Sequence, residues 1–227
     1  MLLILFLVIA FALGSIPFSF IIGKRVRGID LREYGSGNLG ATNVFRTLGR
    51  SWGSLCLFLD MAKGAGAVLL MTALVAGWPQ GEPTPFHIPA DLFRIFAGFL
   101  AAIGHTFSPF VNFHGGKGVA TTAGAFAVLA PYATLTATAV FLALFATTRI
   151  VSLASIAAAS VLPFAVVFFE LRSAQVSSTI IVFVTLVCAW VIFRHRGNIA
   201  RIRAGTEAKV GDNGRTEVYP RDGRGER

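Results

Sequence analysis

Long apolar runs dominate this sequence and decide what it can fold into. Stretches of about 20 mainly apolar residues occur at Met1–Gly23, Trp52–Gly77, Leu92–Val111, Val151–Leu171 and Val176–Phe193. A helix of that length crosses the hydrocarbon core of a bilayer. With 55% hydrophobic and 14% charged residues in a chain of 227, a soluble domain could not bury so much apolar surface. The sequence therefore predicts an all-α, polytopic integral membrane protein.

The stretch Gly118–Thr148 decides the number of spans. It is too long for one ordinary span, and Pro131 in its middle removes a backbone donor, which breaks or kinks a helix. Lys and Arg favour the cytoplasmic side of a membrane, and here six of them lie in Lys24–Arg50 and nine from Arg194 onward. Two helices hinged at Pro131 place both groups on one side, whereas a single span separates them. We therefore expect seven transmembrane helices, with the N-terminus outside and the C-terminus in the cytoplasm.

One domain is expected to hold all of these spans. Residues 1–204 would form it, and the polar, glycine-containing residues 205–227 would form a flexible cytoplasmic tail. The net charge of +9 then follows from orientation and from anionic lipid, so we expect membrane lipid and no nucleic acid as a partner. Cys56 and Cys188 lie within apolar runs as small hydrophobic residues, and without clustered ligands the sequence predicts no metal site and no cofactor.

Three polar segments are unusual as mere connections, and all three lie at the cytoplasmic boundary of the expected topology. The first, Tyr34–Arg46, reads YGSGNLGATNVFR and has three glycines within six residues. Such glycines let backbone amides surround an anion, and the planar guanidinium of Arg46 suits phosphate. An ordinary solvated loop is the alternative interpretation.

The second segment, Gly104–Gly118, contains Gly115, Gly116 and Lys117 directly before an expected helix start. Amides and the dipole at a helix N-terminus favour anions, so this pattern is typical of a phosphate cradle, although a tight turn between helices also explains it. It is not a nucleotide-binding P-loop, because that motif needs a glycine five residues before the Gly-Lys pair and Ser or Thr after it.

The third segment, Phe193–Arg203, carries His195 and Asn198 three residues apart, and so on one face of a helix. A basic stop after the last span is the simpler interpretation of its arginines, but it leaves this polar pair without a role. His105 and His114 are further candidates for acid–base chemistry, and ordinary hydrogen bonding is the alternative for both.

Asp60 and Lys63 lie three residues apart inside an apolar run. Charges in a membrane span are costly, and they usually pair and face the bundle interior. We expect an internal ion pair that holds helices together, and a second anchor for an anionic substrate is the alternative.

The chemistry of these segments narrows the class of function. No His-Glu-x-x-His motif occurs, and no histidine is followed five residues later by aspartate. Arg46 and Lys117 beside glycines indicate phosphorylated substrates, while the membrane indicates a lipid chain. Transfer of an acyl group from an acyl phosphate fits, because phosphate leaves readily and positioning can carry the step. A small anion transporter is the alternative, but it would need polar residues through the depth of several spans.

The order of the motifs resembles a known family. Ser36–Asn43 with Arg46, then Gly104–Gly118, then His195–Arg201 with Gly205–Glu207 strongly resemble the bacterial acyl-phosphate:glycerol-3-phosphate acyltransferases of the PlsY type, over roughly residues 1–210. The resemblance implies a multi-pass enzyme of the bacterial inner membrane with its active site facing the cytoplasm. It implies acylation of the sn-1 hydroxyl of glycerol 3-phosphate to 1-acylglycerol 3-phosphate in phospholipid biosynthesis, and a soluble partner enzyme that supplies the acyl phosphate.

The resemblance also assigns roles to residues. Catalytic roles fall to Ser36, Arg46, Lys117, His195 and Asn198. Substrate binding falls to Asn38, Gly40, Thr42, Asn43, Gly115, Gly116 and Ser152, with the amides of the two adjacent glycines receiving the acyl phosphate. Glu207 is expected to order the tail. We expect a substrate phosphate oxygen to accept the proton of the attacking hydroxyl, because no carboxylate lies in the glycine-rich cores.

Overall fold

Ten α-helices make up most of the described residues, which are 2–77, 89–172 and 178–211 of this computed structural model. In chain order they are α1 (Leu2–Ser15), α2 (Phe18–Arg27), α3 (Ala41–Leu48), α4 (Arg50–Ala76), α5 (Ala90–Thr106), α6 (Val119–Leu129), α7 (Pro131–Thr148), α8 (Val151–Glu170), α9 (Ser178–Arg194) and α10 (Arg196–Arg203). A short 3-10 helix, η2 (Pro109–Val111), follows α5. The described part contains no strand, as the composition predicted.

Five helical stretches in the described residues are long and apolar enough to cross a membrane. They are Ile4–Arg27, Arg50–Ala76, Leu92–Val111, Pro131–Thr148 and Val151–Glu170. α9 and α10 give a sixth if they count as one span bent by 56°. The protein is therefore a multi-pass membrane protein, while the count of seven spans and the orientation of the termini stay predictions.

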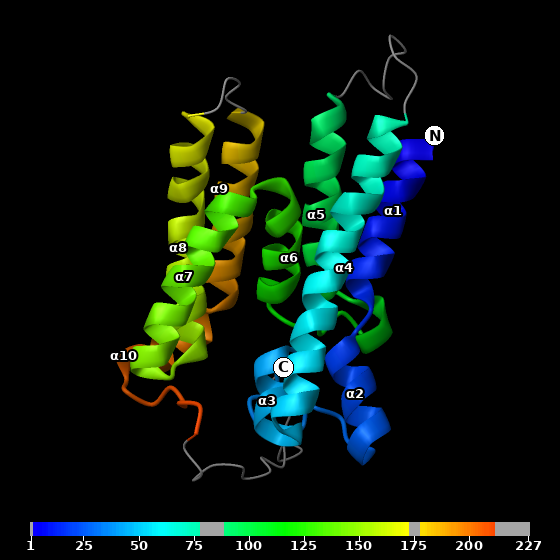
Figure 1. The fold of residues 1–227 in the computed structure, drawn as a ribbon. Coiled ribbons are helices and arrows are strands. Elements are labelled where there is room, and N and C mark those ends of the chain that lie inside the picture. Colours follow the sequence, from blue (N-terminus) through cyan, green and yellow to red (C-terminus); the bar gives the residue numbers. More distant parts are fainter. Residues whose placement is uncertain (1, 78–88, 173–177, 212–227) are drawn as a thin grey trace.

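The break at Pro131 is present. α6 ends at Leu129 and α7 begins at Pro131. Proline is tolerated at the first position of a helix, because the N–H that it lacks would have no hydrogen-bond partner within the helix. The two helices then pack in different places, α6 against α4 and α5, and α7 against α8. Figure 1 shows α6 in the middle of the molecule, between the group of α1, α4 and α5 and the group of α7, α8 and α9.

Glycines bring α4 and α6 into close contact. A Cβ on Gly64 of α4 would lie 2.0 Å from the Thr121 carbonyl oxygen, and one on Gly124 of α6 would lie 2.0 Å from the Met61 carbonyl oxygen. Small residues of this kind let helices approach closely in membranes, where dispersion contacts drive association. The start of α6 is thereby held at a fixed height beside α4.

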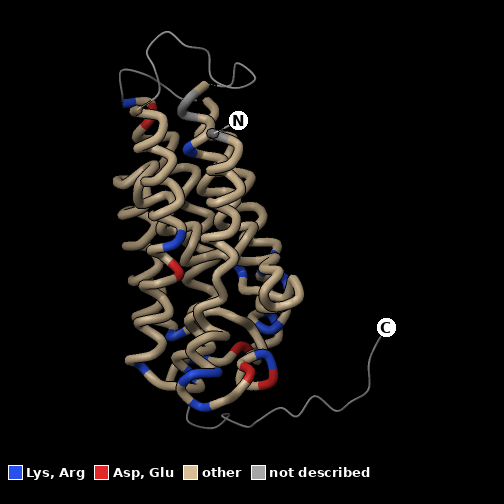
Figure 2. Tube along the Cα trace, turned by 90° about the vertical axis from the view of Figure 1, so that its right-hand side faces the viewer, with Lys and Arg blue, Asp and Glu red and all other residues tan. Residues whose placement is uncertain are grey.

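One end of the bundle gathers the polar residues. Here lie α2, α3, α10 and the loops 28–40 and 107–118, which we call the polar end (Figure 1). Figure 2 shows Lys and Arg concentrated at this end. Leu31, Leu39, Val44 and Cys56 form an apolar core beneath these loops. Residues 78–88, and residues 212–227 of the expected tail, lie outside the described residues.

Candidate active site

The Gly115–Lys117 loop lies along the end of α5. The Gly115 amide donates to the Thr106 carbonyl at 3.0 Å, and the Gly116 amide donates to the His105 carbonyl at 3.2 Å. Both amides therefore satisfy the last carbonyls of α5, which a helix end leaves without partners. The prediction that these two amides receive a phosphate therefore requires that both of these bonds break first.

The open amides come one residue later. In the described part of the chain, the amides of Lys117, Gly118 and the first three residues of α6 donate to no protein carbonyl; the first amide that does so is that of Thr122, to Gly118. Gly118 precedes α6 with a φ of 81°, a left-handed conformation that favours glycine. The phosphate cradle expected from the sequence thus fits the N-terminus of α6, beginning at Lys117.

Asn43 shapes the Tyr34–Arg46 loop from within. Its side chain is 1% exposed, its Oδ1 accepts from the Ser36 amide at 2.9 Å, and its Nδ2 donates to the carbonyls of Leu31 and Tyr34. Both amide hydrogens are used, so Asn43 is committed to the loop and could donate to a substrate phosphate only by giving up one of these bonds.

Ser36, Asn38, Gly40 and Thr42 lie on this loop and on the start of α3. Gly40 directly precedes α3, the Ser36 side chain is exposed, and Asn38 and Thr42 are half-buried. The Leu39 carbonyl oxygen would be 2.4 Å from a Cβ on Gly116, so this loop and the Gly115–Lys117 loop are in direct contact. No hydrogen bond joins the Ser36, Asn38 or Thr42 side chains to Lys117 in the described ranges.

Lys117 begins a chain of polar contacts that crosses the polar end. Its Nζ donates to Asn198 Oδ1, and Asn198 Nδ2 donates to Glu207 Oε1 at 2.6 Å. Ser152 Oγ donates to the same carboxylate oxygen at 2.7 Å, and Arg201 Nε donates to Oε2 at 2.7 Å. Two helices, α8 and α10, thus meet at the carboxylate of the segment after α10, and Lys117 joins them through Asn198.

Arg46 closes this cluster from α3. Its guanidinium donates to the Ala208 carbonyl at 3.1 Å, while the Val210 amide donates to the Arg149 carbonyl at 2.9 Å. The described part of the tail, to residue 211, therefore lies across the polar end, and Glu207 anchors it as expected.

The electrostatics of the cluster are dominated by cations. The pKa of Lys117 is lowered to about 8, mainly by burial and also by the nearby Arg201, Arg194 and Arg46, while Glu207 partly opposes this shift. Burial also lowers the pKa of Arg46. Burial raises the pKa of Glu207, but its hydrogen bonds from Ser152, Asn198 and Arg201 outweigh this, so the net shift is downward. A site of this kind favours an anion with more than one charge.

His195 is buried at the junction of α9 and α10. Its ring Nδ1 lies 2.7 Å from the Val191 carbonyl oxygen, and a carbonyl can only accept, so Nδ1 carries the hydrogen. The neutral ring then offers Nε2 as an acceptor. Beside it, Arg194 donates to the Gly116 carbonyl at 3.4 Å, which ties the end of α9 to the Gly115–Lys117 loop.

The remaining candidates lie elsewhere. His114 is exposed, with its ring 2.5 Å from the Asn112 carbonyl oxygen. Asp60 and Lys63 form the expected buried ion pair at 2.8 Å, inside the bundle. Cys56 and Cys188 are buried free thiols. Within the described residues, no three His, Cys, Asp or Glu side chains gather as metal ligands.

Comparison with known proteins identifies the fold and the site together. The family model described as glycerol-3-phosphate acyltransferase matches residues 4–205. The chain belongs to this family. Proteins called glycerol-3-phosphate acyltransferase from Trichlorobacter lovleyi and Bacillus subtilis are 45% and 41% identical to it, over 88% and 92% of this chain and 93% and 98% of theirs.

Solved structures of PlsY, an integral membrane glycerol 3-phosphate acyltransferase, have the same fold. Its glycerol 3-phosphate form gives a TM-score of 0.77 at 34% identity, covering 92% of this chain and 96% of that one. Its lysophosphatidic acid form gives 0.74 at 34% identity, covering 92% and 95%. The chain is thus a PlsY-type member of the glycerol-3-phosphate acyltransferase family.

Two arginines of this PlsY-type site were not predicted from the sequence. Arg201 lies one helical turn after Asn198 and binds Glu207, a spacing that could have revealed it. Arg194 could be taken only for a basic stop, since nothing in the sequence places it beside Gly116.

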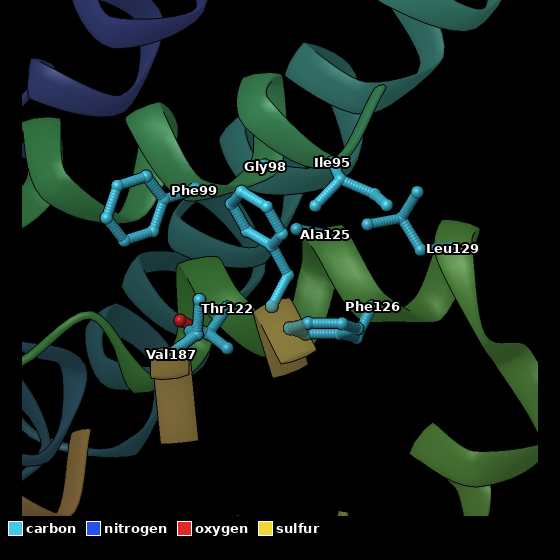
Figure 3. Close-up of a pocket in the computed structure, with 9 residues that line it drawn as sticks. Ile95, Gly98, Phe99, Thr122, Ala125, Phe126, Leu129 and Val187 are labelled. Carbon is cyan, nitrogen blue, oxygen red and sulfur yellow. The ribbon is translucent and has the colours of Figure 1, made fainter. Parts of the chain in front are cut away.

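An apolar pocket lies between α5, α6 and α9 of this family member (Figure 3). Its lining residues are Ile95, Gly98, Phe99, Thr122, Ala125, Phe126, Leu129, Phe183 and Val187. The Thr122 side chain is buried, and it lies one turn along α6 from Gly118. α6 therefore connects the open amides at its N-terminus with this pocket in its middle.

Proposed function

We propose that the protein transfers a fatty acyl group from an acyl phosphate to the sn-1 hydroxyl of glycerol 3-phosphate, forming 1-acylglycerol 3-phosphate and phosphate. The observation that carries the proposal is one connected cluster of cations and amides: Asn198 and Arg201 bond to the Glu207 carboxylate, Lys117 bonds to Asn198, and Arg46 bonds to the neighbouring Ala208 carbonyl. Such a site suits two phosphorylated substrates, and membership of the family supports it.

The acyl phosphate would bind at the start of α6. Its phosphate would accept hydrogen bonds from the amides of Lys117 and Gly118 and from the Lys117 ammonium, where the helix dipole adds to the attraction. Arg46 would bind the phosphate of glycerol 3-phosphate through its planar fork. Ser36, Asn38 and Thr42 line the adjoining loop and would complete the two phosphate sites.

The reaction needs orientation more than covalent help from the protein. The glycerol hydroxyl oxygen attacks the carbonyl carbon of the acyl phosphate, and the bond from that carbon to the phosphate oxygen breaks. The hydroxyl proton passes to an oxygen of the departing phosphate, which leaves as hydrogen phosphate. His195 Nε2, as an acceptor, would orient the hydroxyl, and the cations would stabilise the charge that develops.

The acyl chain would extend along α6 toward the pocket between α5, α6 and α9, and the side chains that line this small pocket would move apart to admit it. With a rise of about 1.5 Å per residue, Thr122 and Phe126 lie about 6 Å and 12 Å along α6 from Gly118. A fatty acyl chain that starts at the α6 N-terminus would therefore reach the pocket. The chain length preference would depend on the side chains that line it.

The setting of the reaction follows from the charge distribution. We place the polar end at the cytoplasmic face of the bacterial inner membrane, because Lys and Arg concentrate there. A soluble enzyme that makes acyl phosphate would then deliver its product to this face. Residues 1–204 would act as one membrane domain, and Glu207 would hold the beginning of the tail.

The test is a reconstitution. Purified protein is incubated with palmitoyl phosphate and glycerol 3-phosphate, and lysophosphatidic acid and phosphate are measured. We expect both products in equal amounts, and at least about a hundredfold loss of rate in Lys117→Ala because a phosphate-binding cation is removed. Lys209→Ala, at an exposed position, is the matched control. Absence of product from folded wild-type protein, or full activity in Lys117→Ala, would contradict the proposal.

The proton acceptor has its own test. If phosphate takes the proton, His195→Ala lowers the rate but keeps the shape of the pH–rate profile. A His195→Ala enzyme that binds both substrates yet loses the acidic limb of that profile would identify His195 as the base instead, because a base acts only when it is unprotonated.

A further inference from the structure

A polar cluster with no part in the proposed chemistry lies beneath the active site. Asp60 and Lys63 of α4 and His105 of α5 are 1%, 6% and 8% exposed. Asp60 Oδ1 lies 2.8 Å from Lys63 Nζ and 3.5 Å from His105 Nδ1. Ionisable side chains within a membrane bundle are expensive, and an apolar set of the same volume would pack helices at least as well.

The cluster reaches the catalytic loop through His105. The His105 carbonyl accepts from the Gly116 amide, and a Cβ on Gly116 would lie 2.2 Å from His105 Nε2. The imidazole ring is therefore packed directly against the glycine that precedes Lys117. On its other edge, Nδ1 faces the Asp60 carboxylate, which favours a hydrogen on Nδ1 and so sets the direction of the ring.

Lys63 fixes the same cluster to a third element. Its Nζ donates at 2.8 Å to the carbonyl of Ile16, in the break between α1 and α2. Ser108 Oγ donates at 2.5 Å to the neighbouring carbonyl of Ser15. His105 and Ser108, which precede the Gly115–Lys117 loop, are thus connected both to α4 and to the region of the α1–α2 break.

We propose that Asp60, Lys63 and His105 are positioning residues for acyl transfer. Asp60 orients the His105 ring against Gly116. The ring in turn fixes the position of the Gly115–Lys117 loop, and so the position at which Lys117 and the open amides of α6 bind the acyl phosphate. This inference rests on the proposed function. A cluster that only joined helices would stabilise the bundle, whereas the proposed cluster also holds the Gly115–Lys117 loop in place.

The main test removes both charges together, because a single change would leave a buried charge unpaired. Asp60→Asn with Lys63→Met keeps the volume close to the original and leaves no net charge. We expect the KM for acyl phosphate to rise about tenfold or more, since small displacements at a reacting centre are costly, while the KM for glycerol 3-phosphate changes less than threefold. Thr138→Val on α7, whose hydroxyl bonds its own helix, is the control.

A second measurement does not depend on activity. Hydrogen–deuterium exchange of a peptide covering residues 114–118 reports the Gly116 amide bond to the His105 carbonyl. We expect exchange there to become at least about tenfold faster in the double variant, with α7 unchanged. His105→Ala, which leaves the ion pair intact, should give the same two effects, and it serves if the double variant does not fold.

The outcomes separate the two proposals. An unchanged KM for acyl phosphate and unchanged exchange in folded variants would overturn the positioning role and leave the pair as helix packing. Equal changes in both KM values, in step with the unfolding temperature, would overturn it as well. Failure of wild-type protein to form lysophosphatidic acid would instead overturn the proposed function, on which this inference rests.

Discussion

Two side-chain amides define the site at the scale of single residues. Asn43 uses its whole carboxamide to hold its own loop, whereas Asn198 lies between Lys117 and Glu207 and passes a hydrogen bond from one to the other. Both were predicted to touch substrate because both lie in polar motifs. Burial and hydrogen-bond partners distinguish the two. Asn43 has no spare donor and therefore organises its own loop, whereas Asn198 lies at a cationic cluster and can exchange a protein partner for a ligand.

The pKa of Lys117 gives a prediction for the pH dependence of binding. In the folded protein that pKa is lowered to about 8, so the ammonium loses its proton as the pH rises through this value. We expect the KM for acyl phosphate to be constant below about pH 7 and to rise above about pH 8. In Lys117→Arg, whose guanidinium stays charged, the rise should be absent. Initial rates between pH 6 and 9 check this, and a rise of the same size in Lys117→Arg would contradict it.

At the scale of elements, the sequence predicted types and order better than contacts. Pro131 revealed the break between α6 and α7, since proline cannot continue the preceding helix. The bonds of the Gly115 and Gly116 amides to the end of α5 were not predicted, because residue types alone do not reveal that this loop folds back onto the helix end. The bonds of Glu207 to Ser152 and Arg201 likewise depend on where α8 and α10 meet in space.

The pocket between α5, α6 and α9 makes a prediction for acyl chain selection. Phe99→Ala should enlarge this pocket and raise the ratio of kcat/KM for hexadecanoyl phosphate over dodecanoyl phosphate by about threefold to tenfold, since a methylene in an apolar site contributes about 0.8 kcal/mol. Phe168→Ala on α8, which is 49% exposed and does not line the pocket, is the matched control. The ratio is measured from initial rates with each donor, and an unchanged ratio in Phe99→Ala would place the acyl chain elsewhere.

At the scale of the whole molecule, the three glycine-rich or basic motifs meet at one end. This convergence was predicted from the distribution of Lys and Arg alone, because the rule that sorts basic residues to one side acts on the whole chain. What it does not predict is how the tail lies across that end, which depends on single bonds such as that from Arg46 to Ala208.

The orientation of the bundle can be measured with single cysteines. Arg27→Cys and Lys209→Cys, both exposed at the polar end, should react with a membrane-impermeant maleimide only when the cytoplasmic face is accessible. Arg172→Cys, exposed just after α8, should react only from the other side. Cys56 and Cys188 are buried and give the background. Labelling of Arg27→Cys and Lys209→Cys from opposite faces would disprove a shared active-site face.

The carboxylate of Glu207 has a consequence for the empty enzyme. Arg46, Lys117, Arg201 and Arg194 would repel one another if no negative charge stood among them. Because Glu207 supplies that negative charge, the four cations stay close together without a substrate. The cluster at the polar end is therefore preorganised for binding a phosphate. The energy of binding then need not be spent on overcoming repulsion between like charges.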